Sequence, residues 1–168
     1  NDEIGELSRE FNKMTERLRR YEEMNIQQII SEKNKSETIV ESIADAIIVC
    51  DAEFDIQLIN HPAEELLHVV EEEVVGKPVG SSITDERILS ILKAPNDPSL
   101  SSMPYLQFKR DQQLVYLRPR VAEILAADGS RKGVVLILQD VSQFKELDKL
   151  KSDFMAAVSH EFRTPLTS

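Results

Sequence analysis

Residues 46–60 read AIIVCDAEFDIQLIN, and this stretch decides the fold class. It holds two short runs rich in β-branched and other apolar residues, Ala46 to Asp51 and Ile56 to Asn60. The residues between them, Ala52 to Asp55, are typical of a turn. The stretch therefore predicts two short strands near the start of a folded domain.

A short helix is expected directly after the second strand. His61 to Leu67 has helical composition, with Asn60 placed as its cap and Pro62 in its first turn. The residues Gly76-Lys77-Pro78 then interrupt the chain.

A second helix is predicted to open at Thr84 and to run to about Lys93. The segment Ala94 to Pro104 holds three prolines and three serines, so it is expected to be a loop.

Three more β runs follow, at Tyr105 to Arg110, Leu114 to Ala126 and Gly133 to Gln139. Alternation along the middle run places Tyr116, Arg118 and Arg120 on one face and Val115, Leu117 and Val121 on the other. Pro119 within that run suggests a bulge or a missing ladder bond. Two strands, short helices and three antiparallel strands predict an α+β domain with a five-stranded sheet and helices on one of its faces.

The segment before this domain is predicted to be a long helix. Residues 1–44 contain no proline and are highly charged, and their apolar residues follow spacings of three and four, which indicates a coiled-coil seam. The seam residues are Ile4, Leu7, Phe11, Met14 and Leu18. One alternative is a helix packed on its own domain, but the polar stretch Ser31 to Thr38 favours a parallel dimer. After Leu18 the register slips by a four-residue step, a stutter that would locally unwind a supercoil.

The segment after the domain, residues 141–168, is predicted to be helical as well. Its apolar residues again recur at threes and fours, with Lys and Asp between them. These residues are Phe144, Leu147, Leu150, Phe154, Val158 and Phe162. A second dimer-forming helix is therefore expected to leave the sheet directly.

Composition excludes several classes of protein. The net charge of −10 and the lack of a basic stripe argue against nucleic-acid binding. The single cysteine, Cys50, excludes an internal disulfide and suggests a small buried side chain. The longest apolar run, Val134 to Leu138, is far shorter than the roughly 20 residues of a membrane helix. Because the chain begins at Asn1 without a methionine, we expect a piece of a longer protein whose membrane span lies upstream.

The last residues, VSHEFRTPLTS from Val158 to Ser168, place reactive groups close together. An imidazole can act as a nucleophile or proton carrier at neutral pH, so His160 is a candidate reactive residue. Glu161 could hold one ring nitrogen, and Thr164, one turn later, could orient a water molecule. Pro165 cannot donate to the Glu161 carbonyl, so it is expected to kink the helix beside the histidine.

The string FMAAVSHEFRTPLT, Phe154 to Thr167, resembles the H-box of bacterial sensor histidine kinases at nearly every position. The resemblance implies that ATP phosphorylates His160 and that Glu161 assists as a base or orienter. It also implies that Thr164 positions water during dephosphorylation, and that the Pro165 kink belongs to the motif.

Two further segments resemble modules found in such kinases. Asp2 to Leu7 with Phe11 to Met14 is similar to the second helix of a HAMP domain. Asn60 to Glu64, Val74 to Pro78 and Gln139 to Ser142 resemble a PAS domain, although Ser142 replaces the threonine of the usual exit motif. The expected domains are a HAMP helix at 1–22, a coiled-coil linker at 23–44, the PAS domain at 45–140, and a signalling helix leading into the phosphotransfer helix at 141–168.

This resemblance implies partners beyond the chain. No asparagine-rich box, glycine-rich lid or P-loop is present, so this chain alone is expected to lack kinase activity. ATP and Mg²⁺ would belong to a downstream domain of the parent kinase, and no cofactor is expected in this fragment. The other expected partners are a second copy, joined through parallel helices, and a response regulator. The chain would be the cytoplasmic portion of an inner-membrane-anchored protein.

Other sites and one rival function stay open. His61 and His68 near Glu64 and Glu65 are conceivable metal ligands, although capping or surface roles are simpler. Arg118 and Arg120 could clamp an anion or merely cover an exposed sheet face. We assign no ligand from the sequence. The rival function is a PAS module that binds a small molecule, with helices that only dimerise it.

Overall fold

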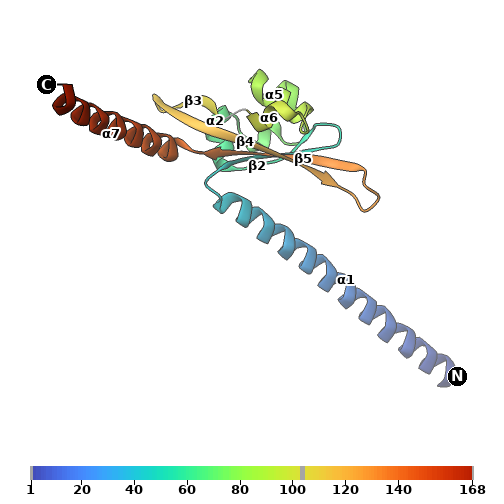
Figure 1. Ribbon diagram of the computed structural model, residues 1–168. Helices are drawn as coiled ribbons and strands as arrows, with labels where there is room; N and C mark the ends of the chain where they lie inside the picture. Colours follow the sequence, from blue (N-terminus) through green and yellow to red (C-terminus); the bar gives the residue numbers. More distant parts are fainter. Residues whose placement is uncertain (1, 103–104, 168) are drawn as a thin grey trace. The chain divides into compact units, whose positions relative to one another are not determined.

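The computed structural model describes residues 2–102 and 105–167, which divide between Ile43 and Ala44 into two compact units. The first unit is one helix, α1 (Asp2–Ser42), with no interruption and with the acidic residues Asp2 and Glu3 in its first turn (Figure 1). No residue within Asp2–Ser42 is buried. The predicted long N-terminal helix is therefore confirmed.

Charged side chains along α1 pair one turn apart. Arg20 lies 3.3 Å from Glu16, and Lys13 lies 3.3 Å from Glu10, with all four side chains well exposed. Such surface pairs contribute only about 0.3–0.5 kcal/mol each to helix stability. The apolar stripe of α1 is as exposed as its charges, with Leu7 73% accessible. Ion pairs on their own therefore account for little of the stability of so long a helix.

The second unit is built on a five-stranded sheet in which every pairing is antiparallel. The strands are β1 (Ala46–Asp51), β2 (Ile56–Ile59), β3 (Leu106–Arg110), β4 (Gln113–Leu125) and β5 (Arg131–Asp140). Their order across the sheet is β2-β1-β5-β4-β3. Pairing of Ala46 with Leu138 places the beginning of β1 beside the end of β5. The predicted α+β class and the five strands are confirmed.

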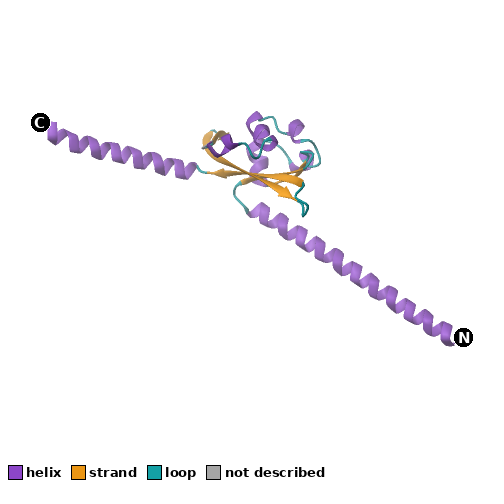
Figure 2. Ribbon diagram, turned by 45° about the vertical axis from the view of Figure 1, so that its right-hand side comes forward, coloured by secondary structure: helices purple, strands orange, loops and turns teal. Residues whose placement is uncertain are grey.

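Short helices cover one face of this sheet (Figures 1 and 2). They are α2 (His61–Leu67), α3 (Glu71–Val74), α4 (Val79–Ser82), α5 (Glu86–Lys93) and α6 (Pro98–Ser102). The core lies between helices and sheet, where Ile48, Leu136 and Leu138 of the strands meet Leu66 and Ile88 of the helices. Burial of each such side chain stabilises the fold by about 1.5–3 kcal/mol.

Two expectations about these helices are wrong. The helix expected to open at Thr84 begins at Glu86, because the Asp85 carboxylate accepts from the Arg87 amide at 2.9 Å and caps it. Arg87 also holds the pKa of Asp85 below its usual range through a side-chain hydrogen bond. Within the stretch expected to be a loop, Pro98–Ser102 forms the short helix α6.

The bulge suggested at Pro119 is absent from β4. Pro119 pairs in register with Leu138, and the ladder to β5 shifts only between Ile124 and Leu125. Leu117 is the last residue of β4 that pairs with β3, so Pro119 lies where β4 has become an edge on that side. Proline is tolerated at such a position because no ladder partner needs its missing N–H.

The chain leaves the sheet through helix α7 (Ser142–Thr167), which follows β5 after a single residue. The predicted C-terminal helix is thus present. Within residues 2–102 and 105–167, each helix is too short or too polar to cross a membrane.

Candidate functional site

Asn60 links the start of β1 to helix α2 through hydrogen bonds. It is fully buried, and its Oδ1 accepts from the amide of Ile47 at 2.8 Å and from that of Ala63 at 3.2 Å. Its Nδ2 donates to the Asp45 carbonyl at 2.9 Å. The predicted capping role of Asn60 is confirmed, and the same side chain also holds the segment just before β1.

The end of β5 is hydrogen-bonded to the same segment, just before β1. Asp140, the last residue of β5, donates its amide to Asp45 Oδ1 at 3.2 Å. Its own carboxylate accepts from the Ser142 amide at 3.0 Å, and its other oxygen lies 3.9 Å from Arg110. Asp45 therefore bonds to both Asn60 and Asp140, and the Asp140 carboxylate accepts from the first amide of α7.

The first turn of α7 is also bonded to the neighbouring strand. The amide of Tyr116 donates to Ser142 Oγ at 2.9 Å, and the amide of Val141 donates to the Tyr116 carbonyl at 2.8 Å. The serine that replaces the usual threonine of the exit motif thus still supplies the hydroxyl that this arrangement uses.

A cluster of two tyrosines and one lysine lies beside these bonds. The rings of Tyr105 and Tyr116 meet edge to face, with centroids 5.2 Å apart and planes at 88°. The Lys145 ammonium lies 3.8 Å from the Tyr105 centroid and 5.3 Å from that of Tyr116, and it donates to the Tyr105 hydroxyl. We call these three residues the lysine seat.

His160 lies on α7, well beyond the seat. Its side chain and that of Glu161 are exposed on the helix surface. The backbone of α7 is helical through Thr167, but the side chains of Thr164 and Pro165 lie outside the described residues, so the water-positioning and kink assignments stay predictions.

An exposed apolar stripe also runs along α7. Phe144, Leu147, Leu150 and Phe154 are each about two-thirds accessible, and Phe162 is 70% accessible. Isolated apolar residues on a surface are ordinary, whereas a continuous stripe of large ones is typical of binding surfaces.

The histidines weighed as metal ligands lie at opposite ends of α2. His61 Nδ1 is 3.4 Å from Glu64 and its Nε2 is 3.3 Å from Glu65, whereas His68 ends the helix with a left-handed backbone. Across residues 2–102 and 105–167, no group of three or more His, Cys, Asp or Glu side chains is arranged to hold a metal ion.

The other side chains considered as sites have structural positions. Cys50 is buried in β1, where burial raises the pKa of its thiol to about 11, so it is protonated at neutral pH. Arg118 and Arg120 lie on one face of β4, across from Gln139 and Ile137 of β5.

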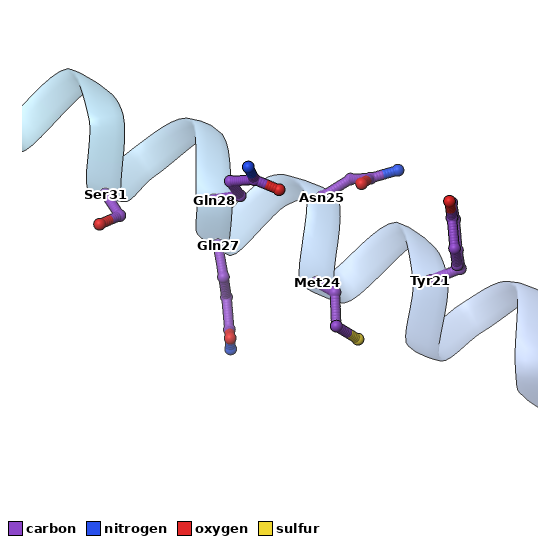
Figure 3. A pocket seen from close by; sticks show the side chains of 6 residues that line it. All are labelled: Tyr21, Met24, Asn25, Gln27, Gln28 and Ser31. Carbon is purple, nitrogen blue, oxygen red and sulfur yellow. The ribbon is translucent and has the colours of Figure 1, made fainter.

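A hollow on α1 does not form an enclosed site. It is lined by Tyr21, Met24, Asn25, Gln27, Gln28 and Ser31. All six belong to one helix, and Figure 3 shows Met24 and Gln27 pointing to one side while Asn25 and Gln28 point to another. The hollow is therefore open helix surface.

A family model described as the PAS fold matches residues 34–141. This chain belongs to the PAS family. The match spans the sheet, the short helices that cover it and the last turns of α1. The predicted PAS resemblance is therefore confirmed.

Curated relatives extend the similarity over the whole PAS chain. Drug sensory protein A of Synechocystis sp. is 31% identical over 98% of this chain and 28% of its own length. Sensor protein kinase WalK of Staphylococcus aureus is 31% identical over 100% of this chain and 39% of its own length. The chain thus spans well under half of the relatives it matches. A PAS domain found in sensor proteins supports a sensory or signalling role.

Solved structures include the histidine kinase ThkA in complex with the response regulator protein TrrA. It aligns with a TM-score of 0.44 and 22% identity, covering 77% of this PAS chain and 41% of that chain.

Sequence reasoning missed the lysine seat and the role of Asp45 in the PAS domain. Alternation along β4 places Tyr116 on a sheet face, but its neighbours depend on the register of β4 with β3 and on where α7 begins. Only the Asp140-Val141-Ser142 exit motif pointed to this region.

Proposed function

We propose that this chain is the sensory and signal-transmitting region of a two-component sensor histidine kinase, in which a signal passes through a HAMP-like helix and the PAS domain to the phosphoacceptor His160. The observation that carries the proposal is the extent of similarity. A sensor protein kinase aligns over 100% of the chain, so the likeness includes both flanking helices as well as the PAS domain.

The path of the chain supports this assignment. α7 follows β5, the central strand of the sheet, after one residue and reaches His160 as one helix, so a shift of β5 can pass directly to the histidine. The exposed position of His160 suits a residue that must meet a separate ATP-binding domain.

The expected chemistry is phosphoryl transfer from ATP. A ring nitrogen of His160 attacks the γ-phosphorus, an N–P bond forms as the bond to the leaving oxygen breaks, and ADP departs. Glu161 serves as base or orienter for the ring. Thr164 positions the water that later hydrolyses the phosphohistidine, and Pro165 bends the helix beside it.

Two copies joined through parallel helices would cover the apolar stripes. Ile4 to Leu18 of α1 and Phe144 to Phe162 of α7 are exposed in the single chain. A coiled-coil dimer buries such stripes, and the stutter after Leu18 gives α1 a place to change its packing.

The remaining parts of the system would lie outside these residues. A downstream domain would bind ATP with Mg²⁺, and a response regulator would receive the phosphoryl group. An upstream membrane span would anchor the protein, with this portion in the cytoplasm.

The decisive experiment measures phosphate transfer to the chain. The chain is incubated with labelled ATP and the isolated ATP-binding domain of a related sensor kinase, and acid-labile label on the chain is counted. We expect label on the parent chain and none on His160→Gln, because glutamine offers no nucleophilic ring nitrogen.

His61→Gln provides a matched control, since His61 is an exposed histidine of the same chain. Label that persists on His160→Gln, or that is absent from the parent chain as well, would contradict the phosphoacceptor role. In that case native mass spectrometry would decide whether the rival function holds, because a small molecule retained by the dimer is its signature.

A further inference from the structure

The first turns of α7 contact the sheet through the polar side of the helix. Ser142 bonds to the Tyr116 amide, and Lys145, three residues later, lies against the rings of Tyr105 and Tyr116. Lys149 and Ser152 continue this side and line the surface hollow between α7 and β4, together with Tyr116. The face of α7 that meets the PAS sheet is therefore defined by these residues.

The apolar stripe of α7 lies on the opposite side. An α-helix turns by about 100° per residue, so Leu147, Phe154 and Val158 project roughly half a turn away from Lys145 and Ser152. The helix can thus rest on its own sheet through one side while the stripe remains available to another helix.

His160 shares the side of the helix that faces the sheet at its root. From Ser142 to His160 the helix makes about five complete turns over roughly 27 Å, so the two residues lie almost in line along it. The direction in which His160 points is consequently set by how α7 is rotated at Ser142 and Lys145.

We propose that Lys145 is a positioning residue: its seat on Tyr105 and Tyr116 fixes the rotation of α7 and so the direction in which His160 is presented. This inference rests on the proposed phosphoacceptor role of His160. The seat itself is a property of the PAS domain and is tested separately.

The lysine suits this task better than the neighbouring bonds do. Ser142 and Val141 bond to the backbone of Tyr116 and fix where the helix begins. Lys145 lies one turn further along, on aromatic faces that attract a cation from a defined direction. Two points of attachment one turn apart specify a rotation, whereas one point leaves the helix able to swivel.

The first test measures the rotation of α7 without any phosphate chemistry. Spin labels on cysteines introduced at Lys109 of β3 and Asp153 of α7, both exposed, report the distance between sheet and helix. Cys50 is buried and stays unlabelled in the folded chain. Labelled chains are diluted with unlabelled ones so that only distances within a chain are read.

We expect a narrow distance distribution in the parent and a clearly broader one in Lys145→Met, which keeps the stem but loses the charge. Lys145→Arg should restore the narrow distribution, because guanidinium also binds aromatic faces. Lys149→Met is the matched control on the same side of α7 and should resemble the parent. If the distance distribution of Lys145→Met is as narrow as that of the parent, Lys145 does not fix the rotation of α7.

The second test uses the labelled-ATP assay on the same variants. Loss of one cation–π contact shifts an equilibrium by about fivefold. We expect Lys145→Met to be labelled about fivefold more slowly, and Lys145→Arg and Lys149→Met at nearly the parent rate. An unchanged labelling rate in Lys145→Met would overturn the positioning role. Absence of label from the parent chain would instead refute the proposed function. The distance measurement alone would then test whether Lys145 fixes the rotation of α7.

Discussion

At the scale of single residues, Asn60 has more structural consequence than any other polar side chain described. It connects the backbone of Asp45 and Ile47, at the start of β1, with that of Ala63 in the first turn of α2. Because the Asn60 side chain is fully buried, water does not readily replace its bonds when the side chain is removed.

Asn60→Ala should therefore lower the free energy of unfolding by about 2–4 kcal/mol, since buried donors and acceptors would remain unpaired. Urea denaturation followed by tyrosine fluorescence measures the change. Asn96→Ala is the control, because Asn96 is exposed and its side chain donates to the Glu123 carboxylate at the surface. It should change stability by less than about 0.5 kcal/mol. Equal effects of the two substitutions would show that Asn60 is not an anchor.

Gly133 is a second residue with a strict requirement. A Cβ atom added there would lie 2.3 Å from the backbone carbonyl oxygen of Cys50, which is fixed within the β1–β5 ladder. Gly133→Ala should cost about 2–3 kcal/mol of stability, because strands must move apart to admit the methyl group.

Gly80→Ala offers the matched comparison, since nothing lies within 4 Å of the Cβ that it would add. Thermal unfolding of both variants should show a lower midpoint only for Gly133→Ala. If both variants have the same midpoint of thermal unfolding, the close approach of β1 and β5 at Gly133 is refuted.

At the scale of elements, most features that depend on adjacent residues can be predicted from the sequence, whereas contacts between distant strands cannot. The Asn60 cap, the Pro62 first turn and the alternation in β4 depend on adjacent residues, and the structure bears them out. The predicted start of α5 at Thr84 is wrong because Thr84 and Asp85 both suit a cap, and in the structure the Asp85 carboxylate accepts from an amide of the first turn.

The requirement at Gly133 and the lysine seat could not be predicted in the same way. Each depends on a neighbour brought in by strand order: Cys50 across the β1–β5 pairing, and Tyr116 through the register of β4 with β3. Hydrophobic alternation assigns a residue to a face of a sheet but gives no register between distant strands. For the candidate site, sequence reasoning supplied His160 and Glu161, while the contacts that orient their helix became visible only in three dimensions.

At the scale of the whole molecule, the two helices differ from the domain between them in what stabilises them. The apolar side chains of the PAS core are buried against one another, whereas the apolar stripes of α1 and α7 remain exposed in a single chain. A helix without tertiary burial gains little from propensity alone, so association with a second copy is the expected source of its stability.

Phe154→Glu should weaken this association by at least tenfold, because it places a charge within the apolar stripe. Sedimentation equilibrium of the parent and the variant measures the dimer dissociation constant. Ala156→Glu, on the opposite side of α7, adds the same charge and should leave the constant nearly unchanged. Dimers of equal strength in both variants would mean that the α7 stripe is not the dimer interface.

The alignment of Ser142 and His160 along one side of α7 also restricts how such a helix can change in length. One residue inserted between them would turn the histidine by about 100°, whereas seven would return it to nearly its former direction. Insertions or deletions of seven residues in this segment would thus be tolerated better than those of one or two. A PAS domain grafted onto a foreign phosphotransfer helix would have to be joined at a matching heptad position.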